Sequence, residues 1–248
     1  MKILDVYNTL NTLAPFSLAE EWDNCGLLVG SFEEECKTTL VCLDVTDDVI
    51  NQAIENEVQL IISHHPVIFD PLKSINFNSK IAKLVKNNIS VISAHTNLDI
   101  AKNGVNDTLC EKLSFEIKEN FADSFGRICT CKKFDTATDL AKYVKEKLNS
   151  EELTFIDASN QINTVAICSG SGSSLAQDVI NSKVDAFITG ELKHNVMLEL
   201  YENKISVVMA GHFSTEVVIT QTLAEKLNAL IPEIKFIPAK ETSIVKEV

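Results

Sequence analysis

Three apolar runs of this chain end in the same way, with a small residue followed at once by a histidine. They are residues 60–64 (LIISH), 91–95 (VISAH) and 207–212 (VVMAGH). Short apolar runs of this kind are typical of buried strands. In a parallel sheet the carboxyl ends of the strands meet at one edge, where α/β folds assemble ligand sites. We therefore expect four of the five histidines, His64, His65, His95 and His212, to face one cleft.

The length and composition fit a globular α/β protein. A chain of 248 residues with 45% hydrophobic content can bury one full core or two smaller ones. No apolar stretch reaches the roughly 20 residues of a membrane span, and the first residues lack the layout of a signal peptide. The seven cysteines are scattered and lie mostly in apolar runs, which favours buried, reduced thiols. We expect a cytoplasmic protein that has no membrane partner.

The net charge of −13 limits the classes of partner. Nucleic-acid binding depends on clustered lysine and arginine, and the sequence has no such cluster, so we expect no nucleic-acid partner. An acidic protein also disfavours anionic substrates unless bound cations reverse the local field.

Helical and strand patterns alternate along the whole chain. Helices are expected over residues 3–13, 46–56, 80–86, 104–112, 173–181, 193–203 and 214–230, with another opened by Thr136 and Asp139. Strands are expected over 39–45, 58–63, 89–94, 127–132, 186–189, 205–209 and 234–237, and around Leu153 and Val165. This order implies right-handed βαβ crossovers and largely parallel sheets. Residues 114–126 are poor in periodicity, so we expect two similar α/β domains, 1–125 and 126–248, that share a cleft; the last strand can return to the first domain.

Two carboxylates accompany the histidines at helical spacing. Asp99 follows His95 by four residues and Glu216 follows His212 by four, so each pair shares a side if the segment is helical or tightly turned. His64 and His65 can serve one site only if the chain leaves the strand there, and the following Pro66 favours that. A lone histidine is more often a structural hydrogen-bonding group, and Glu216 would also suit the first turn of a helix.

Two more expected strands end in polar residues. Residues 169–174 (SGSGSS) form a loop between strand and helix that can expose N–H groups to an anion, although a tight structural turn explains it equally well. Glu191 follows the strand that ends in Thr189-Gly190. It is a candidate general base or a support for a metal ligand, while His194 fits a surface residue.

Taken together, these motifs resemble a known family. Residues 19–30 (AEEWDNCGLLVG), 63–69 (SHHPVIF), 94–99 (AHTNLD), 104–107 (GVND), 189–191 (TGE) and 211–216 (GHFSTE) are similar to the GTP cyclohydrolase 1 type 2 homologue family, also called NGG-interacting-factor-like proteins. The resemblance covers nearly the whole chain in the same order. It implies two similar α/β domains, a dinuclear metal site and a ring-shaped homohexamer, in the short form without an inserted domain.

The resemblance also implies a ligand set, which the chemistry of the residues supports. The implied metal ligands are His64, His65, Asp99, His212 and Glu216, and His95 matches a motif position near the site. Two cations about 3.5 to 4 Å apart need bridging groups, and carboxylates bridge whereas imidazoles do not. Asp99 and Glu216 are thus the expected bridges. The mixed nitrogen and oxygen set fits two divalent ions per subunit, which can be zinc, iron or manganese.

The leading functional hypothesis is a metal-dependent hydrolase that acts on a small molecule, either a nucleotide or another phosphorylated compound. The resemblance adds a GTP cyclohydrolase-like reaction, with Glu191 or His95 transferring protons. The alternative is a metal-binding ring protein without turnover, which stores metal or serves as an interaction scaffold. A third hypothesis is a nucleotide-binding regulator that uses the loop 169–174.

Overall fold

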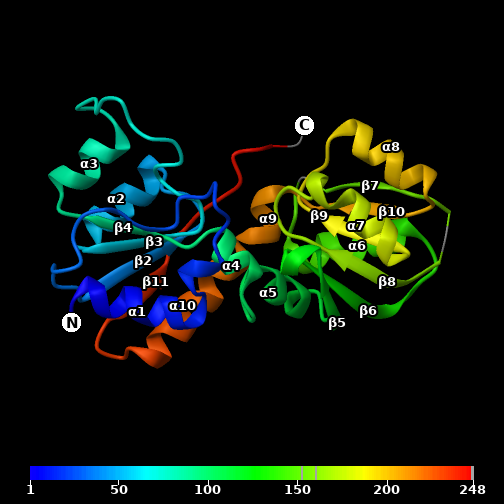
Figure 1. Ribbon diagram of the computed structural model, residues 1–248, viewed down its shortest axis with the longest axis horizontal. Coiled ribbons are helices and arrows are strands. Elements are labelled where there is room, and N and C mark those ends of the chain that lie inside the picture. The colour runs from blue at the N-terminus through cyan, green and yellow to red at the C-terminus, as the bar shows by residue number, and fades with distance from the viewer. Residues whose placement is uncertain (152, 160, 247–248) are drawn as a thin grey trace. The chain divides into compact units, whose positions relative to one another are not determined.

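The computed structural model describes residues 1–151, 153–159 and 161–246, and the chain divides into two compact units (Figure 1). The first unit contains residues 1–102 and 219–241. The second contains residues 103–218 and those from Thr242 onward. Each unit is built on its own β-sheet with helices on its faces, which confirms the α/β fold class.

The first unit has a five-stranded sheet in the order β1-β4-β3-β2-β11. Its strands are β1 (Gly26–Val29), β2 (Thr38–Cys42), β3 (Leu60–Ser63), β4 (Ser90–Ser93) and β11 (Lys235–Pro238). Strands β4, β3, β2 and β11 run parallel, and β1 is antiparallel to β4. The helices are α1 (Ile3–Leu13), η1 (Phe16–Leu18), α2 (Asp47–Glu55), α3 (Lys80–Lys86), α4 (Thr96–Ile100) and α10 (Val218–Leu230).

Side-chain alternation along the strands divides the first sheet into two buried faces. Leu40, Ile61 and Val91 pack with residues of α2 and α3 in one hydrophobic cluster. Helices α1 and α10 lie on the other side of the sheet (Figure 1). Helix α2 begins where the sequence indicates, because the Thr46 side chain accepts a hydrogen bond from the Val49 amide.

The second unit has a six-stranded sheet in the order β5-β6-β8-β9-β10-β7. Its strands are β5 (Glu116–Phe121), β6 (Gly126–Phe134), β7 (Thr154–Ile156), β8 (Ile162–Ile167), β9 (Ala186–Thr189) and β10 (Ser206–Met209). Strands β8, β9 and β10 are parallel to one another. Antiparallel pairs join β5 to β6, β6 to β8 and β7 to β10. The helices are α5 (Val105–Lys112), η2 (Ala122–Ser124), α6 (Ala137–Leu148), η3 (Ser173–Leu175), α7 (Ala176–Ser182), α8 (His194–Glu202) and α9 (His212–Glu216).

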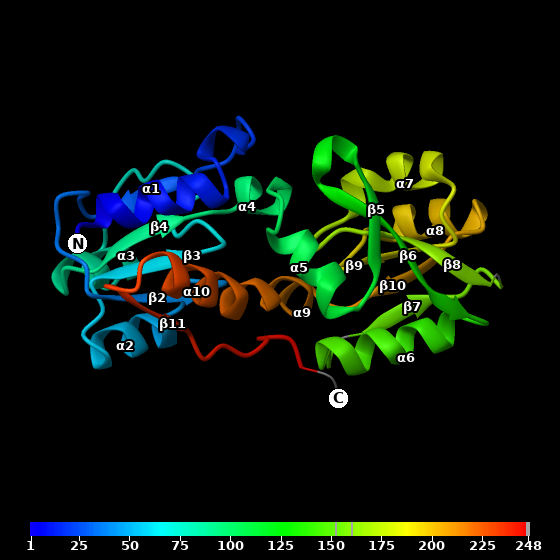
Figure 2. The same cartoon turned by 90° about the horizontal axis from the view of Figure 1, so that it is seen from below.

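Separate hydrophobic clusters cover the two faces of the second sheet. On one face, Val165 and Ile188 pack with residues of α5 and α6. On the other, Ala166 and Phe187 pack with α7 and α8. The helices lie on either side of this sheet when it is seen from below (Figure 2). The unit is therefore a three-layer sandwich, in which neighbouring residues of one strand serve different cores.

The first unit runs to Lys102, and the second begins at Asn103. Strand β5 forms an antiparallel pair with β6 in the second sheet, and β11 pairs parallel with β2 in the first. Strands β1 and β5 were not expected from the sequence, and the helix expected over 214–230 is divided into α9 and α10.

Within the described residues, every helix is too short or too polar to cross a bilayer. All seven cysteines are free thiols, five of them buried, in agreement with the sequence-based expectation.

Candidate metal centre

The carboxyl edge of the first sheet carries a cluster of three histidines. His64 and His65 follow β3, and His95 follows β4 two residues after its end. One ligand atom of each of the three lies within 4.8 Å of those of the other two, and the ring centroids are 5.0 to 5.5 Å apart. Asp99 in α4 lies beside them, with Oδ1 3.6 Å from Nε2 of His64. This histidine cluster (His64, His65 and His95) can hold a metal ion.

The chain turns at the histidine pair as the following proline indicates. Strand β3 ends at Ser63, and the Ser63 hydroxyl donates a hydrogen bond to the carbonyl of His65 at 2.8 Å. The Ser93 hydroxyl of the neighbouring strand donates to the carbonyl of His64 at 3.0 Å. These two bonds replace strand geometry with a local turn, so two consecutive imidazoles approach the same site.

Each imidazole of the cluster is oriented by an oxygen acceptor at Nδ1. His64 donates to the carbonyl of Ala94 at 3.0 Å, His65 to Asp44 at 3.0 Å and His95 to Asp23 at 2.9 Å. Carbonyl and carboxylate oxygens only accept, so Nδ1 must carry the proton in all three rings. In the neutral form the lone pair then lies on Nε2, the arrangement that metal-binding histidines adopt when an outer oxygen orients them.

Asp23 is the buried one of the two carboxylate acceptors, with a side chain that is 0% exposed against 51% for Asp44. It also accepts hydrogen bonds from the Thr96 amide and hydroxyl and from the Cys25 thiol. Burial alone would raise the pKa of Asp23, but the hydrogen bonds from His95, Thr96 and Cys25 outweigh it and hold that pKa well below its usual range. Asp23 is therefore a stable anion beside His95.

The carboxyl edge of the second sheet carries His212 and Glu216. His212 begins α9 directly after β10, and its Nε2 lies 3.1 Å from Oε2 of Glu216 one turn later. The other ring nitrogen, Nδ1, lies 3.4 Å from Glu191, which follows β9. Glu191 is 60% exposed at its side chain, whereas the Glu216 side chain is 6% exposed. A histidine and a buried carboxylate thus form a second donor pair, with Glu191 at its solvent side.

The glycine-serine loop after β8 supports this donor pair. The Gly170 amide donates to the Thr215 hydroxyl and the Ser169 amide donates to Asn106, so both N–H groups are used within the protein. Gly170 has φ of +60°, and a Cβ at this position would overlap the carboxylate of Glu216. The Ser169 and Gly170 amides are therefore engaged in a tight structural turn and are not offered to an anion.

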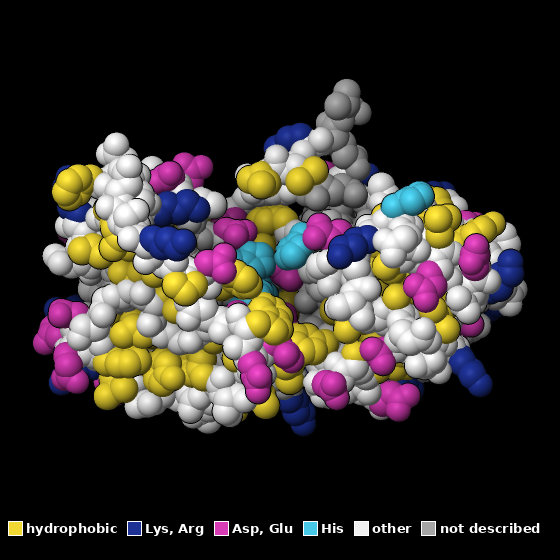
Figure 3. Space-filling view, turned by 45° about the horizontal axis from the view of Figure 1, so that its top comes forward, with side chains coloured by type: hydrophobic (Ala, Val, Ile, Leu, Met, Phe, Trp, Pro, Cys, Tyr) yellow, Lys and Arg dark blue, Asp and Glu magenta, His cyan; other side chains and the backbone are white. Residues whose placement is uncertain are grey.

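The residues of both edges fit a divalent transition metal. Neutral imidazoles with tethered Nδ1 atoms and carboxylates are the donors that zinc, iron and manganese accept. The absence of a Cβ at Gly170 leaves room for the Glu216 carboxylate. Histidine side chains reach the molecular surface (Figure 3), which leaves access for a small solute.

The site residues expected from the sequence lie in two groups, one in each unit. His64, His65, His95 and Asp99 come together in the first unit, and His212, Glu216 and Glu191 in the second. His194 is exposed at the start of α8, as expected for a surface residue. The sequence analysis missed Asp23 and Asp44. Asp44 ends the apolar run of β2, a position that could have revealed it.

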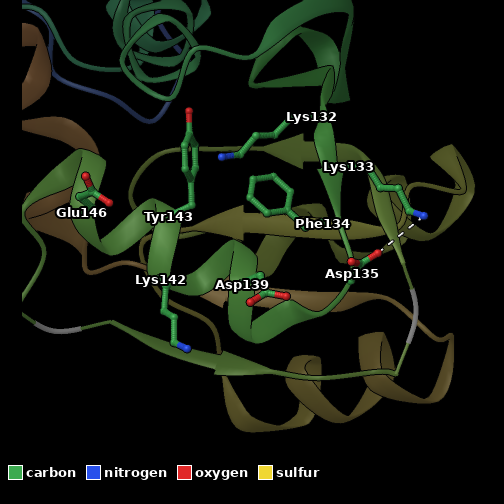
Figure 4. Close-up of a pocket in the computed structure, with 8 residues that line it drawn as sticks. All are labelled: Lys132, Lys133, Phe134, Asp135, Asp139, Lys142, Tyr143 and Glu146. Carbon is green, nitrogen blue, oxygen red and sulfur yellow. Dashed lines mark ion pairs between the residues drawn. The ribbon is translucent and has the colours of Figure 1, made fainter.

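A separate surface pocket lies on the second unit between β6 and α6 (Figure 4). Its lining includes Lys132, Phe134 and Tyr143, and the Lys132 ammonium lies 4.2 Å from the centre of the Tyr143 ring and 5.2 Å from that of Phe134. The other lining side chains are two lysines and three carboxylates. The lining of this pocket therefore contains no cluster of metal-binding side chains, and its positive and negative charges are mixed.

Comparisons of the sequence agree on one family. A family model described as Duf34/NIF3 (NGG1p interacting factor 3) matches residues 1–243. The GTP cyclohydrolase 1 type 2 homolog of Campylobacter jejuni is 37% identical over 238 residues, which cover 93% of each chain. The protein of the same name from Clostridium acetobutylicum is 34% identical over 244 residues, 93% of this chain and 91% of that one.

Solved structures show the same architecture over the whole length. A hypothetical protein of Staphylococcus aureus superposes with a TM-score of 0.92 at 28% identity, covering 100% of this chain and 99% of its own. The reduced form of HcgD from Methanocaldococcus jannaschii gives a TM-score of 0.82 at 30% identity, with 97% and 98% covered.

Proposed function

This chain belongs to the Duf34/NIF3 (NGG1p interacting factor 3) family, and from that premise we propose that it is a dinuclear metal-dependent hydrolase acting on a nucleotide or another phosphorylated small molecule. The observation that carries the proposal is the histidine cluster, in which three imidazoles meet and each has its Nδ1 proton bound by an oxygen. Three converging imidazoles are unfavourable in a hydrophobic core, whereas imidazoles oriented in this way are suitable donors for a metal ion.

The proposed ligands come from both units. His64, His65 and Asp99 belong to the first, and His212 and Glu216 to the second. The two carboxylates are the only bridging donors among these five, so we assign the bridges to them.

Bound metal ions would supply Lewis-acid activation of water and a positive local field for a phosphate group. Glu191 is the proton-transfer group of this proposal, since its carboxylate is exposed to solvent and lies 3.4 Å from His212. His95 was the other candidate from the sequence, and it lies within the histidine cluster, hydrogen-bonded to Asp23. The name of the relatives makes GTP the first nucleotide to test.

The proposal extends to assembly and location. The family resemblance implies a ring-shaped homohexamer, and the sequence, which has no apolar stretch long enough to span a membrane, favours the cytoplasm. Analytical ultracentrifugation should then give six times the 27.4 kDa mass of the chain. A monomer or dimer at micromolar concentration would contradict the hexamer without affecting the metal chemistry.

The deciding experiment combines metal analysis with an activity screen on one preparation. We expect nearly two equivalents of zinc, iron or manganese after gentle reconstitution, and hydrolysis of GTP, another nucleotide or a phosphoester that disappears on chelation and returns with added metal. Saturation near one equivalent would contradict the dinuclear site. Full metal content without turnover on any nucleotide or phosphoester would favour the metal-storage or scaffold alternative.

A further inference from the structure

The histidine cluster lies entirely within the first unit, so it needs no donor from the second unit. His64, His65 and His95 follow adjacent parallel strands, β3 and β4. Their ligand atoms lie within 4.8 Å of one another. Three nitrogen donors at this spacing are enough for a catalytic-type metal site that keeps a position open.

We infer that His95 is itself a metal ligand and that Asp23 is its positioning residue, so that the first unit alone binds one divalent transition-metal ion on three imidazoles. This inference rests on the metal binding proposed above but does not depend on hydrolysis. It replaces the proton-transfer role that the sequence suggested for His95.

The contacts of Asp23 fix both the orientation and the tautomer of His95. One carboxylate oxygen lies 2.9 Å from Nδ1 of His95, and the other accepts from the Thr96 amide at 3.0 Å and its hydroxyl at 2.5 Å. Thr96 is the next residue in the chain, so Asp23 holds the imidazole and the backbone beside it together. The ring cannot turn over without breaking a bond to a fully buried carboxylate.

His95 shares the feature that marks the two ligands already proposed. All three rings donate from Nδ1 to an oxygen, and the rings of His64 and His65 have centroids 5.2 and 5.5 Å from that of His95. A ligand needs a fixed tautomer, since its lone pair has to remain on the nitrogen that faces the metal. A fixed tautomer serves a proton carrier as well as a ligand, so it is the convergence of the three imidazoles that favours a ligand role for His95.

The side chains around His95 restrict the orientation of its imidazole ring. The Trp22 ring meets it edge-on at 6.4 Å between centroids, and the His95 side chain is only 18% exposed. Trp22 and Asp23 are neighbours in sequence, so one short segment before β1 packs against His95 and also accepts a hydrogen bond from its ring.

The test isolates the first unit's site within the full chain. In the double variant His212→Ala/Glu216→Ala, Co²⁺ titration followed by optical absorption and elemental analysis should give one equivalent per chain. Adding His95→Gln should weaken Co²⁺ binding by at least tenfold. Adding Asp23→Asn, which keeps the shape but removes the charge, should weaken it about 10- to 100-fold, the scale for removing a group that orients a metal ligand.

The matched control is His194→Gln, because His194 is exposed on α8 and belongs to neither donor group. It should leave Co²⁺ affinity unchanged. If His95→Gln binds Co²⁺ as tightly as this control, the inference is overturned. Circular dichroism of the metal-free variants shows whether each one folds.

A second measurement needs no change at His95. In the Co²⁺-loaded double variant, proton NMR should show three exchangeable, strongly shifted ring N–H signals, one for each imidazole bound through Nε2. Two signals would overturn the role of His95 even if every substitution at that position failed to fold. If the unaltered protein binds two metals while the double variant shows two signals, only this inference fails; if the unaltered protein binds none, the proposed function fails as well.

Discussion

Gly170 packs directly against Glu216, and the position of its missing Cβ is occupied by the Glu216 carboxylate. The contact joins the loop after β8 to helix α9 after β10, across the intervening strand β9. A glycine that sequence patterns suggested for an anion loop thus makes room for the carboxylate of Glu216, a proposed metal ligand.

Gly170→Ala should therefore displace Glu216 and lower the metal content of the protein. Its φ of +60° adds backbone strain of about 1 kcal/mol for a residue with a Cβ. Gly26→Ala is the control, because Gly26 also has positive φ but has no neighbour closer than 4.0 Å to a Cβ. Both variants should melt at lower temperature, and only Gly170→Ala should lose metal by elemental analysis. Equal metal content in the two would contradict the role of this contact.

Glu191→Gln should separate metal binding from proton transfer. Glutamine keeps the size of the side chain and can still accept a hydrogen bond from Nδ1 of His212, so metal content should be unchanged. It cannot take up a proton, so turnover should fall about 100-fold or more. The exposed Glu199 of α8 provides the control variant Glu199→Gln, which should keep full rate. Full rate in Glu191→Gln would exclude the catalytic role, and loss of metal would make Glu191 a ligand.

Breaking the ion pair between Arg127 and Asp107 should destabilise the second unit strongly. Arg127 is 1% exposed at its side chain, and it also donates to the carbonyl of Ser124. Asp107→Ala removes a carboxylate that pairs with this buried guanidinium, and breaking a buried pair in this way costs about 3 to 5 kcal/mol. Chemical denaturation measures the loss. The exposed pair Lys118–Glu116 is the comparison, and Lys118→Ala should leave the denaturation midpoint nearly unchanged.

Cys25 should react slowly with alkylating reagents at neutral pH. Burial, followed by the hydrogen bond to Asp23, raises the pKa of the Cys25 thiol to about 12. A raised thiol pKa means less thiolate at every pH below it, so the labelling rate should rise about tenfold for each pH unit between 8 and 10. Asp23→Asn removes the negative charge and should speed labelling. Mass spectrometry of the Cys25 peptide follows both, and a rate independent of pH would refute the assignment.

The gathering of histidines could be predicted because strand ends and histidines coincide in the sequence. Apolar runs that stop at His64 and His212 are local patterns, and parallel pairing brings the ends of such runs to the carboxyl edge of a sheet, the first sheet for His64 and the second for His212. The starts of helices could be predicted from local patterns in the same way: the Thr136 side chain accepts a hydrogen bond from the Asp139 amide at the start of α6.

The sequence could not predict the groups that orient the histidines. Asp23 lies 72 residues before His95, and the bond between them depends on how β1 pairs with β4. That pairing is antiparallel and short, and β1 has no alternating pattern of polar and apolar residues to reveal it. Strand β5 could not be predicted for another reason. Five of its six residues are exposed, so it lacks the apolar run that marks a buried strand.

The return of β11 to the first sheet has a consequence for synthesis on the ribosome. Strand β11 pairs with β2, yet it emerges only after the whole segment 103–218. Until then the nascent sheet ends in an open β2 edge, which is a template for mispairing with other chains. Strands β3 and β4, which carry the three imidazoles, pair with each other without waiting for it. The sheet edge that carries the histidine cluster can thus be assembled early in translation, while the opposite side of the same sheet closes last.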